Sequence, residues 1–447
     1  MIVMIFKGWA KWVCKMKNKP FISIVIPTRD RPMLVAEVLK FISNQSFTNY
    51  EVIVSDNGIN SSCFSEVLPY LADGRFTYKK PAYPMDMCTH WDFAIEGVSG
   101  EYLTVFCEKF MLRYDALQCI FDLAQYHSPD IITWQFDFFD VTVVEKDELL
   151  GSYHPLVKPT SPIKYSAQSE LERRFSFDFP SISRHKKNSD SYGKLYSGCV
   201  KTHIINRVKQ LYGRVFYPMS PDFTSMFAIL NESEKCIDIA QSLMLVVNMQ
   251  GTSNGEATKK SAVVARQFIT ESEVDFQQYV QQLPLPGYWI GHNVSIASDM
   301  LLIQKLAPNG PIKKLTLDIS ALAFWAQIDF NQVSDWGDVE RDKMQTILLK
   351  YIADMSNISK KRLDDNSIVA LQPNLTEIYH SGLEKLTEFN PDTSAIELAE
   401  LHWIKGIAPP RKNISLEPVA LEQALQYFYE YNLRSCELLG IDLKEVS

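Results

Sequence analysis

Short apolar runs alternate with helical patterns along the first 140 residues. Residues 21–27, FISIVIP, form a nearly continuous β-branched run, which is typical of a strand buried on both faces of a parallel sheet. A segment with an early proline and helical apolar spacing follows at 31–42. Further strands are predicted at 51–58, 76–78, 102–106 and 131–139, and further helices at 87–98 and 115–127. This order predicts an α/β fold with a mostly parallel sheet that binds ligands at the carboxyl ends of its strands.

The alternation weakens in the middle of the chain and is absent after residue 255. Residues 141–195 are polar and predict irregular structure, with a basic run at 183–188. Helices are predicted beyond residue 255 at 262–282, 335–355, 395–405 and 421–439, the third of them behind an S-x-x-E capping box at Ser394 and Glu397. We therefore expect an α/β domain at 20–255, with halves at 20–140 and 141–255, and a mainly helical domain at 256–447.

Residues 1–19 predict an amphipathic helix. Three lysines lie on one face of the helix, and apolar residues that include two tryptophans lie on the other: Lys7, Lys11 and Lys15 against Ile2, Ile5, Trp9, Trp12, Val13 and Met16. This pattern favours a helix at a membrane surface, and the alternative is a helix that docks on the protein's own core. The apolar run is too short for a secretory signal, and its lysines follow rather than precede it.

The net charge and the spacing of the cysteines indicate which classes of protein are unlikely. The 447 residues carry a net charge of -8, which argues against a nucleic-acid binder. The eight cysteines form no C-x-x-C pair and no metal-ligand spacing, so we expect reduced thiols in a cytoplasmic protein.

Three motifs in order carry a family resemblance. They are VIPTRDRP at 25–32, QSFTNYEVIVSDNG at 45–58 and SGEY at 99–102. Together they resemble the nucleotide-binding half of inverting glycosyltransferases with the GT-A fold, the large family 2 group. The resemblance implies a nucleotide-binding half at 20–140, an acceptor half at 141–255 and a nucleoside-diphosphate sugar as donor, with UDP expected.

The resemblance also implies roles for residues in these motifs. The turn formed by Pro27, Thr28, Arg29 and Asp30 would lie along the nucleotide, and Asp56 with Asn57 would bind the base. Asp56 and Asn57 are also turn formers, so a purely structural turn is the alternative. His90 is either a sugar contact or a packed histidine.

The metal site of the family is altered in this sequence. Family members place an acidic cluster after the G-E-Y strand to hold Mg²⁺ or Mn²⁺, whereas this chain has Cys107, Glu108, Lys109 and Phe110 there. Cysteine and phenylalanine are poor partners for a hard cation, and a lysine repels it. Three alternatives follow: Glu108 holds a weak or dispensable metal, Lys109 supplies the positive charge instead, or the site is inactive.

The candidate general base is Asp222. It lies in YPMSPDFTS at 217–225, which resembles a segment of polysaccharide-assembly members of the family. Ser220 and Asp222 could equally begin a helix as capping residues. Asp137 and Asp140 are the alternatives for the base.

These features together predict a bacterial, cytoplasmic glycosyltransferase at the inner face of the membrane. It would transfer a sugar with inversion to a glycan or lipid-linked glycan acceptor in surface-polysaccharide biosynthesis. The sequence leaves open whether the protein forms an oligomer, and no nucleic-acid partner is expected. The alternative is a non-catalytic GT-A-like scaffold or binding subunit of a polysaccharide-assembly complex. A sugar nucleotidyltransferase is less favoured because its glycine-rich, basic first turn is absent.

Overall fold

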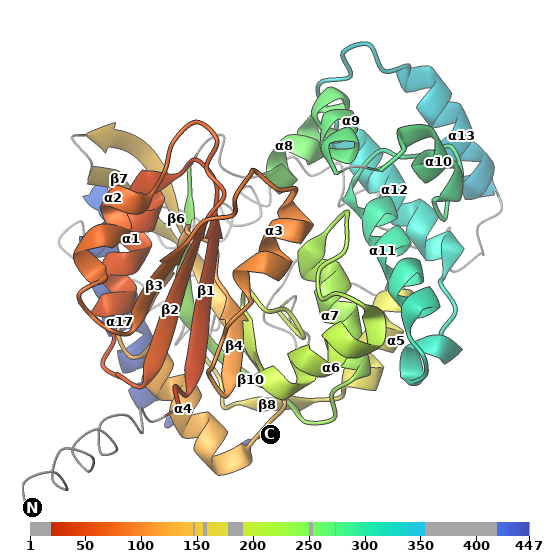
Figure 1. Cartoon of the computed structure of the whole chain (residues 1–447). Helices are drawn as coiled ribbons and strands as arrows, with labels where there is room; N and C mark the ends of the chain where they lie inside the picture. The colour runs from red at the N-terminus through yellow and green to blue at the C-terminus, as the bar shows by residue number, and fades with distance from the viewer. Residues whose placement is uncertain are drawn as a thin grey trace, which may run out of the picture.

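The computed structural model describes residues 19–145, 148–154, 159–177, 191–249, 254–272, 274–353 and 418–446. Its centre is one sheet with helices on both faces and a helical cluster beside it (Figure 1). No helix within these ranges is long and apolar enough to cross a membrane. The predicted helices at 1–19 and 395–405, and the basic run at 183–188, lie outside the described residues, Lys19 excepted.

The first half of the sheet is parallel and has the order β3-β2-β1-β4. Its strands and helices lie close to the predicted ranges, which confirms this part of the sequence analysis. They are β1 (Ile22–Thr28), α1 (Pro32–Ser43), β2 (Tyr50–Asp56), β3 (Phe76–Lys79), α3 (Met87–Ala94), β4 (Tyr102–Val105) and α4 (Ala116–His127). A short helix α2 (Phe64–Val67) and a 3-10 turn η1 (Leu68–Tyr70) precede β3.

The second half of the sheet is mixed. Strand β9 (Gly198–Lys201) lies between β4 and β6 (Ile131–Glu145) and is antiparallel to both. Strand β10 (Cys236–Asn248) is parallel to β6 and antiparallel to β5 (Phe110–Leu112) and β8 (Ile163–Tyr165). The predicted α/β class is confirmed, and its parallel pairing is concentrated in the first half.

The described residues between 141 and 195 form more strand and helix than their polar sequence predicted. Strand β6 continues to Glu145 and pairs with β7 (Glu148–His154), and α5 (Ala167–Phe175) follows β8. The end of β6 is exposed, so it has no buried apolar run to reveal it in the sequence. Its regularity comes from the main-chain hydrogen bonds to β7.

The helical cluster packs on the same core as the parallel strands. It contains α8 (Asn254–Lys260), α9 (Ala262–Glu271), α10 (Phe276–Gln282), α11 (His292–Leu306), η2 (Pro311–Lys314), α12 (Ile319–Gln332) and α13 (Arg341–Ala353). The helix predicted at 262–282 is two helices, and α11 and α12 were not predicted. Both of these are apolar around much of their circumference, so neither has the one-sided stripe by which a surface helix is recognised.

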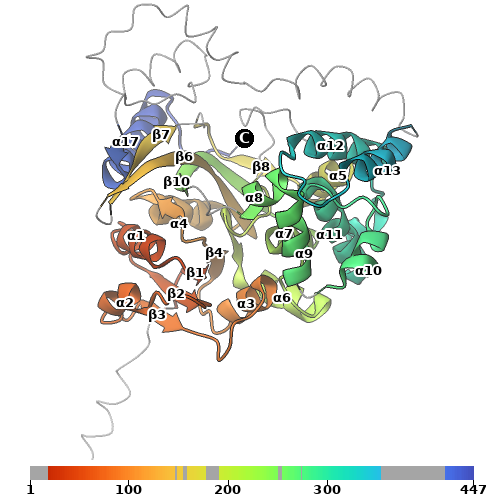
Figure 2. The same ribbon diagram turned by 90° about the horizontal axis from the view of Figure 1, so that it is seen from above.

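The chain returns to the sheet at its C-terminal end. Strand β11 (Val419–Ala420) pairs with β7, and α17 (Leu421–Leu438) lies beside β7 and β10 (Figure 2). Its buried side chains belong to the core under α1 and α4. The predicted helix at 421–439 is confirmed, but it packs on the sheet rather than on α8–α13. The other predicted domain boundaries stay predictions.

Candidate active site

Three of the predicted segments meet at the carboxyl edge of the parallel strands. Thr28 at the end of β1 is opposite Asp56 at the end of β2, and the Asn57 N–H donates to the Thr28 carbonyl at 2.9 Å. Strand β4 lies on the other side of β1, so residues 107–110 leave the sheet at the same edge. The geometry that the alternating pattern predicted is therefore present.

Asp30 organises the loop after β2. Its carboxylate accepts the backbone N–H groups of Ile59, Asn60 and Ser61 at 2.8, 2.8 and 2.9 Å. Burial raises the pKa of Asp30, but these donors outweigh it and hold the pKa below its ordinary value. The neighbouring Thr28 hydroxyl is buried and has no hydrogen-bond partner within the described residues. That free hydroxyl is one group at this turn that a ligand could engage.

Asp56 makes the contacts of a structural turn. Its carboxylate accepts hydrogen bonds from Gly58 N, Ser62 Oγ, Tyr78 Oη and Cys63 N at 2.7–3.1 Å. Burial raises the pKa of Asp56, yet these four donors bring it below its ordinary value. The turn alternative is therefore observed, and base recognition by Asp56 stays a prediction.

Asn57 and His90 fix the loop and the helix that flank β2. The Asn57 amide donates to the Met85 carbonyl at 2.8 Å and accepts its N–H at 3.0 Å. His90 on α3 lies 2.9 Å from Ser55 Oγ through Nε2 and is buried. Burial lowers the pKa of His90 to about 4, so its ring is neutral at pH 7. His90 thus has the surroundings of a packed histidine, and a sugar contact stays a prediction.

Glu108 is paired with a cation of the protein itself. Arg31 Nη1 donates to Glu108 Oε1 at 2.6 Å, and the Cys107 thiol lies 3.5 Å from Oε2. The Glu108 side chain is only 4% exposed. No group of three or more His, Cys, Asp or Glu side chains that could hold a metal occurs in the described ranges. The Glu108 carboxylate is thus already neutralised by Arg31, and its role as a metal ligand stays a prediction.

Asp222 lies in the first turn of α7 (Pro221–Asn231), which follows α6 (Thr202–Tyr212). Ser220 makes no side-chain capping bond there. Lys194 Nζ is 3.7 Å from Asp222 Oδ2, and the Asp222 side chain is 24% exposed. Asp222 is therefore accessible to solvent and stands next to a positive charge.

Lys194 was not predicted as a site residue, because it lies in the segment that was expected to be irregular. Its side chain is 7% exposed, donates to Tyr196 Oη at 2.9 Å and lies 4.0 Å from the centre of the Phe223 ring. Burial lowers the pKa of Lys194, but Tyr196 and Asp222 raise it above its ordinary value. The Tyr196 ring lies 5.6 Å from that of Phe110, so Lys194 and Tyr196 connect Asp222 to the segment at 107–110.

The alternative bases have other surroundings. Asp137 is fully buried in β6 and accepts a hydrogen bond from Tyr153 at 2.8 Å. Asp140, also on β6, accepts one from the Asn248 amide at 2.8 Å. Asp222 is better suited to meet an acceptor hydroxyl than Asp137, which no solvent reaches.

The strand order and the polar edge define a GT-A-like α/β protein, the fold class that the sequence predicted. No protein-family model matches the chain. Over 90 residues it is 33% identical to a protein of Escherichia coli K12 named as a colanic acid biosynthesis glycosyl transferase, WcaA; this covers 20% of the chain and 32% of that protein. The chain thus matches about a third of the length of that relative. Over this stretch, the glycosyltransferase resemblance is confirmed.

Two solved structures align with most of the chain at low identity. S. aureus TarS 1–349 in complex with UDP-GlcNAc has a TM-score of 0.44 and 9% identity, over 75% of this chain and 93% of that one. The mannosyltransferase PcManGT from Pyrobaculum calidifontis, in complex with GDP-Man and Mn²⁺, has a TM-score of 0.36 and 12% identity, over 82% and 87%. Both scores are low, so the fold class rests on the strand order and not on these structures.

Proposed function

We propose that this protein is an inverting glycosyltransferase that takes a sugar from a nucleoside-diphosphate donor, with UDP favoured, to a glycan or lipid-linked glycan acceptor. The observation that carries the proposal is the meeting of the segments at 27–30, 56–57 and 107–110 at one sheet edge, connected to Asp222 through Tyr196 and Lys194. The local similarity to a glycosyl transferase supports the reaction class. Surface-polysaccharide biosynthesis is the setting that we propose.

The donor nucleotide would lie along Pro27–Asp30 and against the turn at Asp56. Thr28 offers a buried hydroxyl, and Arg29 offers an exposed guanidinium beside it. Arg29 can meet a diphosphate oxygen in a charge-assisted hydrogen bond. The carboxylates at this edge already hold loops, so we assign them to shaping the site more than to binding the phosphate.

The charge of the departing diphosphate needs a partner in the transition state. Because Glu108 already forms an ion pair with Arg31, we assign this role to Lys109. Lys109 directly follows Glu108 in the sequence, and its side chain is half-buried. A fixed cation can stabilise developing negative charge without an ion. A bound Mg²⁺ or Mn²⁺ would then be weak or dispensable.

Asp222 is proposed to accept the proton of the acceptor hydroxyl. That oxygen forms the new bond to the anomeric carbon while the bond from this carbon to the diphosphate oxygen breaks on the opposite face. The electron pair of the broken bond leaves with the nucleoside diphosphate, and the proton goes to the Asp222 carboxylate. One displacement of this kind inverts the anomeric configuration.

The Asp222→Asn variant tests this assignment. The amide keeps the size of the side chain but cannot take up the proton, so sugar transfer should fall by ~100-fold or more, the size of general-base contributions. Donor affinity and melting temperature should stay near those of the wild type. A joint loss of stability and donor binding would instead identify Asp222 as a structural residue. Near-normal transfer would move the search to Asp140 and Asp137, whose Asp→Asn variants form the comparison.

A non-catalytic GT-A-like binding subunit is the second candidate. The altered acidic motif has one carboxylate, Glu108, and the ion pair with Arg31 already neutralises it. The two candidates differ in turnover. Donor hydrolysis and transfer measured over a panel of nucleotide sugars, with and without EDTA, separate them. Saturable nucleotide binding without any turnover would favour the binding subunit.

We also propose that residues 1–19 hold the protein at the cytoplasmic face of a membrane. The lysine and tryptophan faces of this segment support the assignment. A membrane location would bring the enzyme close to a lipid-linked acceptor.

A further inference from the structure

A carboxylate from the helical cluster binds the main chain just before Asp222. Asp299 lies on α11, and its Oδ1 and Oδ2 accept the N–H groups of Met219 and Ser220 at 2.9 and 3.0 Å. The two residues are 80 and 79 positions away in the sequence. Pro221 and Asp222 follow directly, so Asp299 holds the point at which the chain enters the first turn of α7.

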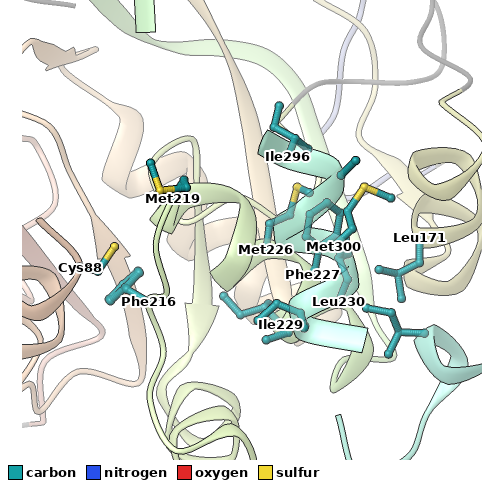
Figure 3. Close-up of a cluster of buried hydrophobic side chains, with 14 of the residues drawn as sticks. Cys88, Leu171, Phe216, Met219, Met226, Phe227, Ile229, Leu230, Ile296 and Met300 are labelled. Carbon is teal, nitrogen blue, oxygen red and sulfur yellow. The ribbon is translucent and has the colours of Figure 1, made fainter. Parts of the chain in front are cut away.

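Apolar packing fixes the rest of this contact. Figure 3 shows Ile296 and Met300 of α11 against the side chains of α7, with Met219 nearby. The buried α7 residues of this interface include Met226, Phe227 and Leu230. Helix α7 therefore rests on α11 along its length, and the two hydrogen bonds from Asp299 add a polar contact at its N-terminal end.

Asp299 is an expensive residue for a purely structural contact. Its side chain is buried, and burial raises its pKa to about 8. The negative charge of Asp222 contributes to this rise, and the N–H groups of Met219 and Ser220 oppose it. A buried carboxylate close to another one is costly unless its hydrogen bonds are good. Both oxygens of a carboxyl group, ionised or protonated, can accept from two neighbouring backbone N–H groups, whereas an amide has only one accepting oxygen.

We propose that Asp299 is a positioning residue, through which the helical cluster fixes Met219 and Ser220 and so places the Asp222 carboxylate for proton transfer. The proposal rests on the role given above to Asp222. It assigns a function to the helical cluster, namely the support of the acceptor half of the site. Small displacements of a catalytic group are costly to a reaction that depends on its alignment.

The Asp299→Asn variant tests the proposal, with Asp329→Asn as its matched control. Asp329 on α12 is also buried, and its oxygens accept Asn293 N and Nδ2 at 2.9 and 3.0 Å. Burial raises its pKa to about 6, so the two residues have similar chemistry. The partner of Asp329 is at the start of α11, however, and not next to Asp222.

We expect Asp299→Asn to lower kcat for transfer by roughly 10- to 100-fold, the cost of a misplaced catalytic group, with the donor KM unchanged. The amides of Met219 and Ser220 should exchange with deuterium at least ~10-fold faster, as expected of a locally loosened segment. Asp329→Asn should change neither quantity at equal folded fraction. Both variants are compared with the wild type at temperatures where all three are folded.

The two readouts separate this proposal from the proposed function. If the wild type transfers no sugar, the proposed function fails, and amide exchange still decides whether Asp299 holds the segment. The positioning role would be overturned if the Met219 and Ser220 amides of Asp299→Asn exchange as slowly as in the wild type. It would also be overturned if the kcat of this variant equals that of the wild type. An equal fall of kcat in Asp329→Asn would also overturn it, since the effect would then be general destabilisation.

Discussion

At the residue scale, the carboxylates of the site differ in what they bind. Asp30 and Asp56 accept main-chain N–H groups, and Glu108 accepts a guanidinium. Asp222 lies 3.7 Å from an ammonium group and keeps part of its side chain in solvent. A carboxylate saturated with N–H donors is stabilised as an anion and is a weak base. These contacts leave Asp222 as the best suited of the four to accept a proton.

The first prediction at this scale concerns Lys109. If its ammonium group stabilises the leaving diphosphate, Lys109→Ala should lower turnover by roughly 100-fold or more, the loss found when one stabilising group is removed. EDTA should leave appreciable activity, because Arg31 already neutralises Glu108. Steady-state transfer assays measure both effects.

Phe110→Ala is the control for this prediction, since it removes a neighbouring side chain without a charge. It should lower turnover less than Lys109→Ala. Complete loss of activity in EDTA, together with a silent Lys109→Ala, would identify Glu108 as a metal ligand.

His90 provides a prediction for pH. Its pKa is about 4 in the folded protein and 6.5 as an ordinary value, so between these pH values the unfolded chain binds the proton more tightly. The stability that the neutral ring contributes is present above pH 6.5 and is lost as the pH falls toward 4. The loss should reach up to ~3 kcal/mol, from the size of the shift. Urea unfolding of the wild type and His90→Gln from pH 7.5 to 4.5 measures it.

The difference between these two proteins is the quantity of interest, because the raised pKa values of Asp299 and Asp329 act in the opposite direction in both. The wild type should lose more stability than His90→Gln over this range. Parallel curves for the two proteins would contradict the buried neutral state of His90.

At the scale of elements, α17 shows how a distant segment completes the sheet. It packs Leu421, Ala424, Leu425 and Phe428 into the core that α1, α4 and the strands share. About 65 residues outside the described ranges separate it from α13. Sheet stability should therefore depend on a helix from the far end of the chain.

Phe428→Ala tests this dependence. Phe428 is fully buried, and loss of its ring should lower the free energy of unfolding by ~3–5 kcal/mol through lost burial and a new cavity. Leu433→Ala on the same helix is the control, because Leu433 is 41% exposed and should change stability by ~0.5 kcal/mol or less. Equal effects in chemical unfolding would mean that α17 does not pack on the sheet in solution.

At the scale of the whole molecule, two large hydrophobic cores run through the described chain. One joins β1, β2, α3 and β4 to α5–α7 and the helical cluster, and the other lies under α1, α4 and α17. Asp92 on α3 accepts the Val215 N–H just before the segment at 217–222, and Asp299 of the cluster accepts N–H groups within it. The cluster is thus part of the framework of the site.

The membrane assignment also belongs to this scale. Deletion of residues 2–17 removes four lysines and two tryptophans, so binding to anionic vesicles should fall by ~10-fold or more, at about 1 kcal/mol per basic residue. Circular dichroism should show that the rest of the protein stays folded. Sedimentation with vesicles measures the binding, and neutral vesicles serve as the control. Unchanged sedimentation would show that this segment is not the membrane contact.

The sequence by itself determined the parallel half of the sheet and the place of its ligand edge. Buried strands such as β1 and helices such as α1 are encoded by local apolar patterns and by prolines, which act within a few residues. Asp56, Glu108 and Asp222 became candidates because the short motifs around them resemble those of a glycosyltransferase family. Local patterns also predicted the helix at α17, although not the surface on which that helix packs.

Only the tertiary structure decided the state of these candidates. Arg31 meets Glu108 across 77 residues, and Asp299 meets Met219 across 80. Whether a side chain is neutralised or is available to bind a ligand depends on such distant partners. The periodic pattern of apolar residues does not encode these contacts. Helices α11 and α12 were hidden for a related reason: each is covered by other helices on more than one side, so their pattern lacks a polar face.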